Sequence, residues 1–147
     1  MPKLLIFESG LIRNGLPLIR RQYLESEDLK TNPTLVGGFL SAIQQFTAAT
    51  FKDLPTLLKM ERYMACLKRI DWSSDHFLLY AICDGKGDPK IIQNALAKIT
   101  KRLVGWETAL ESIDTEDYKG LFPIFDEEFS LLNRNYADSF VDWLAEV

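Results

Sequence analysis

The sequence predicts a mixed α/β domain of the α+β type, in which two strands, a helix, three strands and two further helices follow one another. Two patterns predict this order: short apolar or alternating runs of strand length, and three longer stretches whose apolar residues recur every three or four positions. With 147 residues, 47% hydrophobic and 26% charged, the chain fits one soluble globular domain rather than a disordered or collagen-like segment.

The first two strands are expected to form a β-hairpin. An apolar run at 4–7 is ended by Glu8-Ser9-Gly10, and a second run at 16–23 follows the turn-prone Arg13-Asn14-Gly15. Pro17 lacks a backbone N–H, which favours an edge position for the second strand. The neighbouring Arg20 and Arg21 must lie on opposite faces of that strand.

The first helix is predicted over residues 33–50, because Asn32-Pro33 provides an N-cap and a first-turn proline. Its helical periodicity is carried by Leu35 or Val36, Phe39, Ile43, Phe46 and Thr50. Gly37-Gly38 in the first turns costs about 1 kcal/mol per glycine relative to alanine. This cost suggests close packing of the helix backbone, with the sheet as the expected neighbour.

Three strands are predicted next, at residues 57–61, 62–70 and 77–83. The middle strand has no purely polar face, so both of its faces are expected to be covered. The last strand is apolar throughout, which suits a central strand buried on both sides.

Asp88-Pro89 predicts the start of a second helix at 89–105, which Gly105 is expected to stop. An acidic connection leads to a third helix at about 124–146. Its aromatic stripe is expected to pack on the sheet, with docking into a partner as the alternative. The stripe comprises Phe125, Phe129, Tyr136, Phe140 and Trp143.

Charge divides the chain near residue 106. Residues 1–106 carry a net charge of +5 and residues 107–147 carry −9. The first part is expected to be the main domain, and the second an acidic connection and amphipathic helix packed on it. Deletion of residues 124–147 should therefore expose apolar surface and cause aggregation.

Residue types that carry catalysis, cofactors or metals are few, and no catalytic, cofactor-binding or metal-binding residue is predicted. His76 is the single histidine, and Cys66 and Cys83 match no zinc or redox motif, which suits buried free thiols in a reducing compartment. The loop at 84–88 lacks the Walker and EF-hand spacings. The sequence therefore predicts a protein that is not an enzyme.

Basic residues gather on the second helix at Lys98, Lys101 and Arg102. A pI of about 5.0 and the lack of a reading motif argue against nucleic acid. Peripheral contact with anionic lipid headgroups suits this face better, and the acidic C-terminal segment is an intramolecular alternative. The sequence has no export signal and no apolar stretch long enough to span a membrane, so a cytoplasmic location is expected. Any contact of the protein with a membrane is expected to be peripheral.

Three stretches resemble a longin-like domain, a fold related to roadblock domains of archaea and of eukaryotic trafficking machinery. They are residues 6–10 with 15–18, residues 35–43, and residues 78–84 leading into a helix. The resemblance, which covers about 100 residues, implies a five-stranded, antiparallel-rich sheet sandwiched by helices, the first helix on one face and the later ones on the other. It also implies dimerisation and contact with small GTPases or trafficking partners. Residues 107–147 depart from a longin SNARE, because they offer neither a long heptad helix nor a membrane anchor.

The expected function is a noncatalytic, dimerising interaction platform for a small GTPase or a second longin- or roadblock-like protein. The expected dimer edge and polar contact residues are Leu57, Lys59 and Glu61 at one sheet edge, and Gln44, Gln45 and Lys52 on or after the first helix.

Two alternatives stay open. One is a small ligand-binding or enzymatic domain with a pocket between the sheet and the C-terminal helix, for which a polar pocket containing Tyr80, Cys83 or His76 would argue. The other is a profilin-like cytoskeletal module, although profilins usually begin with a helix and this chain begins with a strand.

Overall fold

The structure, a computed structural model, describes residues 5–23, 33–72, 75–106, 119–130 and 132–133. Its elements are β1 (Ile6–Arg13), β2 (Leu16–Gln22), α1 (Pro33–Phe51), β3 (Leu57–Lys59), β4 (Tyr63–Trp72), β5 (Asp75–Asp84), α2 (Pro89–Leu103) and the 3-10 helix η1 (Val104–Trp106). A third helix covers residues 122–130 and 132–133. The acidic connection at 107–118, and residues 134–146 of the predicted last helix, lie outside the described residues.

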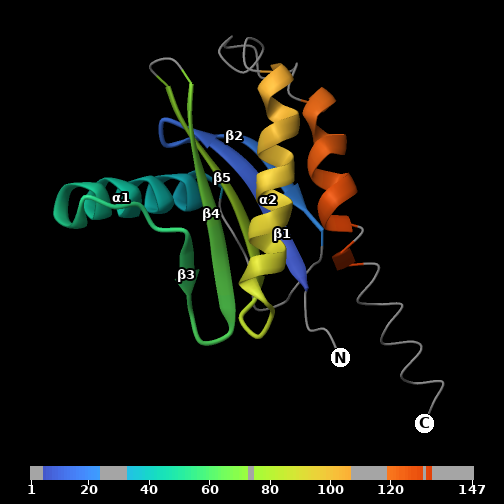
Figure 1. Ribbon diagram of the computed structural model, residues 1–147, viewed down its shortest axis with the longest axis horizontal. Coiled ribbons are helices and arrows are strands. Elements are labelled where there is room, and N and C mark those ends of the chain that lie inside the picture. Colours follow the sequence, from blue (N-terminus) through green and yellow to red (C-terminus); the bar gives the residue numbers. More distant parts are fainter. Residues whose placement is uncertain (1–4, 24–32, 73–74, 107–118, 131, 134–147) are drawn as a thin grey trace.

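The five strands form one antiparallel sheet in the order β2-β1-β5-β4-β3 (Figure 1). This confirms the predicted α+β class. β5 pairs with β1 and β4 and is buried along Phe77–Cys83, as its apolar sequence predicts. β2, which contains Pro17, lies at one edge of the sheet, and the short β3 lies at the other.

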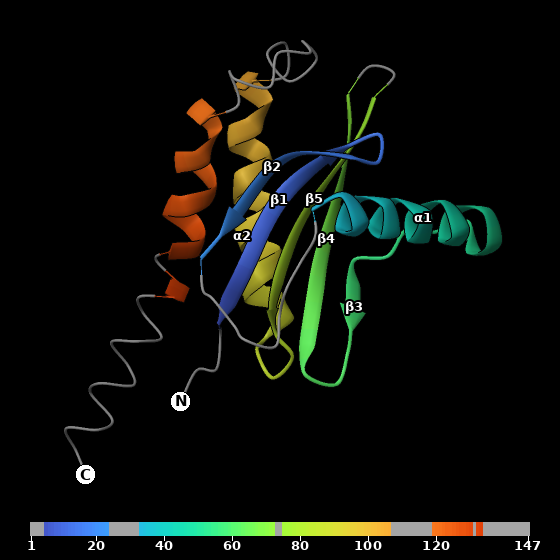
Figure 2. The same ribbon diagram turned by 180° about the vertical axis from the view of Figure 1, so that it is seen from behind.

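Helices cover both faces of the sheet (Figures 1 and 2). α1 lies on one face, where Leu40 packs into a small apolar cluster with side chains of β1, β4 and β5. α2 and the third helix lie on the other face and bury a larger cluster that includes Ile99, Phe125 and Phe129. Both faces of β4 are thereby covered, as predicted.

β1 is longer than the sequence suggested. The prediction that it ends at Glu8-Ser9-Gly10 is wrong, because the strand continues to Arg13. Glu8 and Ser9 are buried but have hydrogen-bond partners, and a Cβ on Gly10 would lie only 2.5 Å from the carbonyl oxygen of Ile19. Residue types that locally favour a turn are used here for tertiary hydrogen bonds and for close packing.

The predicted β1–β2 hairpin turns at Asn14-Gly15. Both residues have positive φ, 48° and 86°. This is the requirement of the two-residue turns that match the twist of paired strands, and Asn-Gly is their preferred sequence.

α2 forms where it is predicted, and the third helix is present over the part of its predicted range that the structure describes. The Asp88 side chain caps α2 by accepting a hydrogen bond from the backbone N–H of Lys90 at 2.9 Å. The α-helix ends at Leu103, before Gly105, which lies in η1. The third helix begins at residue 122 rather than 124.

Candidate functional site

α1 is a helix without a single charged residue, and one side of it is open to solvent. Leu35, Phe39, Phe46 and Phe51 are 60% to 70% exposed. Phe39 and Phe46 helped to predict the helix, yet they lie on the side turned away from the sheet. The residues that α1 buries against the sheet are Gly37, Leu40 and Gln44.

We define the outer face of α1 as six exposed residues at helical spacing. They are Leu35, Gly38, Phe39, Ala42, Phe46 and Ala49. α1 also extends past the β3 edge of the sheet, so much of its length lies beyond the strands (Figures 1 and 2). Sequence periodicity could not identify this face, because α1 has apolar residues on every side. The signal that could have identified an exposed apolar face was the lack of charged residues over all 19 positions of α1.

The predicted edge residues lie at β3, which pairs with β4 alone within the described sheet. Leu57 is half-buried, whereas Lys59 and Glu61 are exposed. Glu61 lies outside the strand, because the backbone N–H of Met60 donates to Tyr63 O and starts the turn into β4. The expected strand at 57–61 is thus shorter by two residues.

The polar residues predicted on or after α1 differ in their exposure to solvent. Gln45 is exposed, and Lys52 is exposed with φ of 58° and donates to the carbonyl of Ala49 at the end of α1. Gln44 is instead buried, with 8% of its surface exposed. Gln44 shares the helix face of Leu40, toward the sheet, so the polar contact expected of it does not lie on the exposed side of α1.

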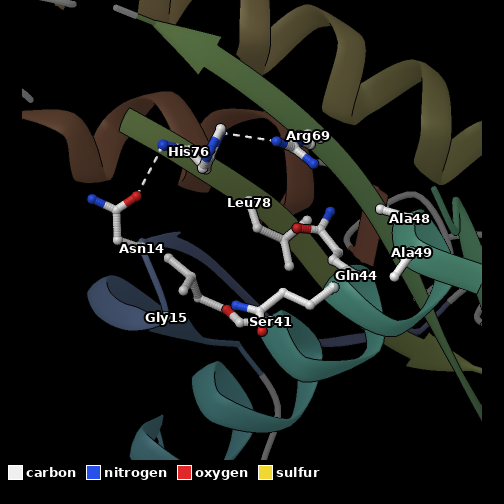
Figure 3. A pocket seen from close by; sticks show the side chains of 11 residues that line it. Asn14, Gly15, Ser41, Gln44, Ala48, Ala49, Arg69, His76 and Leu78 are labelled. Carbon is white, nitrogen blue, oxygen red and sulfur yellow. Dashed lines mark hydrogen bonds between the residues drawn. The ribbon is translucent and has the colours of Figure 1, made fainter. Parts of the chain in front are cut away.

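A pocket of about 610 Å³ lies between α1 and the end of the sheet that carries the β1–β2 turn and the start of β5 (Figure 3). Gln44 forms part of its wall, and its Nε2 is buried without a hydrogen-bond partner among the described residues. The lining residues are Ile12, Asn14, Gly15, Ser41, Gln44, Gln45, Ala48, Ala49, Arg69, His76 and Leu78.

Arg69 and His76 form the wall opposite α1 and are linked to Asp71. Arg69 Nε donates to Asp71 Oδ1 at 2.9 Å, and Arg69 Nη2 lies 2.8 Å from His76 Nδ1 (Figure 3). His76 Nδ1 also lies 2.8 Å from Asp71 Oδ1. The hydrogen bonds from His76 and then from Arg69 lower the pKa of Asp71.

This pocket is on the opposite face from the one expected for the ligand-binding alternative. Between the sheet and the third helix, the described residues form a packed apolar cluster. His76 lines the pocket, whereas Tyr80 and Cys83 are buried in the core and do not. Among the described residues, no group of three His, Cys, Asp or Glu side chains is placed to hold a metal ion.

The basic face of α2 is partly used within the molecule. Arg102 Nη1 donates to Glu127 Oε2 of the third helix at 2.6 Å, while Lys98 and Lys101 are exposed. On the same side, Arg21 makes two hydrogen bonds to Asp126, at 2.7 and 3.0 Å. The acidic C-terminal part thus supplies intramolecular partners for basic residues. None of the helices within the described ranges has the length and apolarity needed to cross a membrane.

No protein-family model matches the chain, and no curated protein matches its sequence.

Proposed function

We propose that the protein is a dimerising interaction module that associates, with itself or with a similar domain, through the outer face of α1 and the adjacent β3 edge. The outer face of α1 is the observation that carries the proposal. A surface helix of a monomer normally presents polar or charged residues to water, and a contiguous exposed apolar patch marks an interaction site.

The chemistry of the outer face suits a second copy of the same chain. Since it has no charge, two copies can meet about a two-fold axis without like-charge repulsion. Gly38, Ala42 and Ala49 allow two helices to approach closely between the larger Leu35, Phe39 and Phe46. Burial of each large side chain contributes about 1.5–3 kcal/mol.

The β3 edge adjoins this face and supports the same assembly. β3 has three residues and pairs only with β4 in the described sheet, so backbone groups on its other side can pair with a further strand. α1 leads into β3 through residues 52–56, which keeps both features on one side of the molecule (Figure 1).

The proposed partner beyond the dimer is a small GTPase or a trafficking-like complex. This part of the proposal rests on the longin- and roadblock-like resemblance, which the five-stranded antiparallel sheet with helices on both faces supports. In this proposal the dimer presents a composite surface for recognition and performs no chemistry itself.

Light scattering coupled to size-exclusion chromatography tests the dimer. The wild type is expected to elute with twice the mass of the chain, and the double variant Phe39→Ser/Phe46→Ser as a folded monomer. Val104→Ser is the matched control, because Val104 is also exposed, at 57%, but follows α2 on the other side of the sheet. A wild type that is strictly monomeric at high concentration contradicts the proposal.

A pull-down with small GTPases loaded with GDP or a GTP analogue tests the partner class. Nucleotide-dependent capture by the wild type, lost in the double variant, is the expected result. A dimer that captures no GTPase in either state would overturn the partner and leave the dimer standing.

A further inference from the structure

The pocket between α1 and the sheet contains an unused hydrogen-bond donor. Gln44 is more than nine-tenths buried, and its Nε2 has no partner among the described residues. Buried polar groups are nearly always paired, and an unpaired one destabilises the folded state. Figure 3 shows the Gln44 amide extending from α1 toward the sheet wall of the pocket.

The facing wall also offers donors. A guanidinium group carries five N–H groups. Within the described part of the chain, Arg69 Nε donates to Asp71 and Arg69 Nη2 lies 2.8 Å from His76 Nδ1, so further N–H groups are available on the same side chain. The carboxylate nearest to Arg69 is already held by Arg69 and His76, and Asp71 does not line the pocket.

The remaining lining of the pocket combines apolar residues with the polar Asn14, Ser41, Gln45 and His76. Ile12 and Leu78 of the sheet and Ala48 and Ala49 of α1 contribute to it. The volume of about 610 Å³ lies within the range of small-molecule sites, in which a few placed polar groups orient a mainly apolar ligand.

We propose that this pocket binds a small organic carboxylate with a short apolar body. The Gln44 amide and the Arg69 guanidinium donate to the carboxylate oxygens, and the body of the ligand packs on Leu78 and Ile12. Donors on both walls select an acceptor, and a guanidinium group makes stronger hydrogen bonds to a carboxylate than to a neutral carbonyl. The donors Gln44 and Arg69 lie on the sheet side of α1 and so do not depend on dimerisation, although Ala49 belongs to both the pocket lining and the outer face.

Two-dimensional NMR titration with sodium butyrate tests the site, with butyramide as the neutral analogue of equal shape and sodium chloride holding ionic strength constant. Butyrate is expected to produce saturable shifts at Ser41, Gln44, His76 and Leu78, and butyramide much weaker ones. Arg69→Gln and Gln44→Leu should each raise the Kd by about tenfold or more, since each removes a hydrogen bond to a charged group.

Lys68→Gln is the matched control. Lys68 neighbours the half-buried Arg69 on β4 and is a cation too, but it projects from the opposite face of the sheet, so the Kd should stay unchanged. If Gln44→Leu fails to fold, Gln44→Met repeats the test with a flexible apolar side chain.

Three results would overturn the proposal. They are equal binding of butyrate and butyramide, an unchanged Kd in both pocket variants, and the lack of any saturable shift with butyrate. If the third result is accompanied by binding of a peptide through its C-terminal carboxylate, the pocket is assigned to a protein partner.

Discussion

Glu8 is a carboxylate buried in the middle of a strand, and two side chains hold it there. Tyr80 Oη donates to Glu8 Oε2 at 2.8 Å, and Arg20 Nε donates to Glu8 Oε1 at 3.1 Å. On the opposite face of β1, Ser9 Oγ lies 2.6 Å from Tyr23 Oη. The two tyrosines therefore meet β1 from its two sides, and both keep their hydroxyl groups away from water.

Burial gives these tyrosines a role in alkaline stability. Burial, together with the neighbouring Glu8 carboxylate, raises the pKa of Tyr80, and burial raises that of Tyr23, both above the ordinary value of 10.0. Below pH 10 the phenols are protonated in both folded and unfolded chains. As the pH rises above 10, only the unfolded chain loses these protons, so the free energy of unfolding must fall.

Tyr80→Phe tests this at the residue scale. The free energy of unfolding of the variant should be lower than that of the wild type by about 1–3 kcal/mol at neutral pH, because the hydroxyl that donates to Glu8 is removed. Its free energy of unfolding should then decline less steeply than that of the wild type between pH 9 and 11. Urea denaturation at several pH values measures both effects, and parallel pH profiles for wild type and variant would contradict the assignment.

At the scale of elements, α1 has two different glycines. A Cβ on Gly37 would lie 3.0 Å from the carbonyl oxygen of Gly15, whereas a Cβ on Gly38 would meet nothing within 4 Å. The close packing predicted for both residues therefore holds for Gly37 and is wrong for Gly38, which lies on the outer face.

The pair Gly37→Ala and Gly38→Ala turns this difference into a measurement. Gly38→Ala should raise the free energy of unfolding by about 0.5–1 kcal/mol, because alanine favours the helix. Gly37→Ala should be less stable than Gly38→Ala by about 1 kcal/mol or more, since crowding against the hairpin turn offsets the gain. Denaturation in the Phe39→Ser/Phe46→Ser background removes any effect of association, and equal gains would contradict the packing.

The contrast between the two long helices shows what local sequence can predict. In α2, polar residues mark the exposed side, and Ile92, Leu96 and Ile99 are buried as their spacing indicates. In α1, apolar residues occur on every side of the helix, so periodicity predicts a helix without identifying its buried face. The sequence therefore predicts that both helices form, but it identifies the buried face of α2 alone.

The pocket could not be predicted for a related reason. Gln44 and Arg69 are 25 positions apart and belong to different elements, so their approach depends on how α1 crosses the sheet. β1 shows the same limit, because Glu8 is tolerated through partners at positions 20 and 80. Composition, turns and caps are local, whereas these placements require the tertiary fold.

At the scale of the whole molecule, the third helix is part of the core. Phe125 and Phe129 are fully buried in the cluster shared with α2. Two ion pairs, Arg21 to Asp126 and Arg102 to Glu127, flank this packing. Their side chains are one third or more exposed, so each pair is worth at most about 1 kcal/mol, and the apolar contacts hold the helix.

Deletion of residues 119–147 should therefore cause aggregation and binding of hydrophobic dyes. The matched control, Asp126→Asn/Glu127→Gln, removes both ion pairs but keeps the aromatic contacts. This variant should stay soluble, and its free energy of unfolding should fall by about 2 kcal/mol or less. Dye fluorescence and light scattering compare the two, and a soluble truncation of unchanged stability would show that the helix is a detachable arm.

The position of β1 between β2 and β5 has a consequence for synthesis of the chain. β1 pairs with β5 across roughly 70 residues, from Ile6 with Cys83 to Arg13 with Phe77. At about 5–20 residues per second, a ribosome needs roughly 4–14 seconds to make that interval. During this time the β1–β2 hairpin can form, but the other edge of β1 has no strand to pair with. β1, the first strand to be synthesised, is thus completed only when β5 has been made. A nascent chain that stalls before β5 would present the unpaired edge of β1 to chaperones.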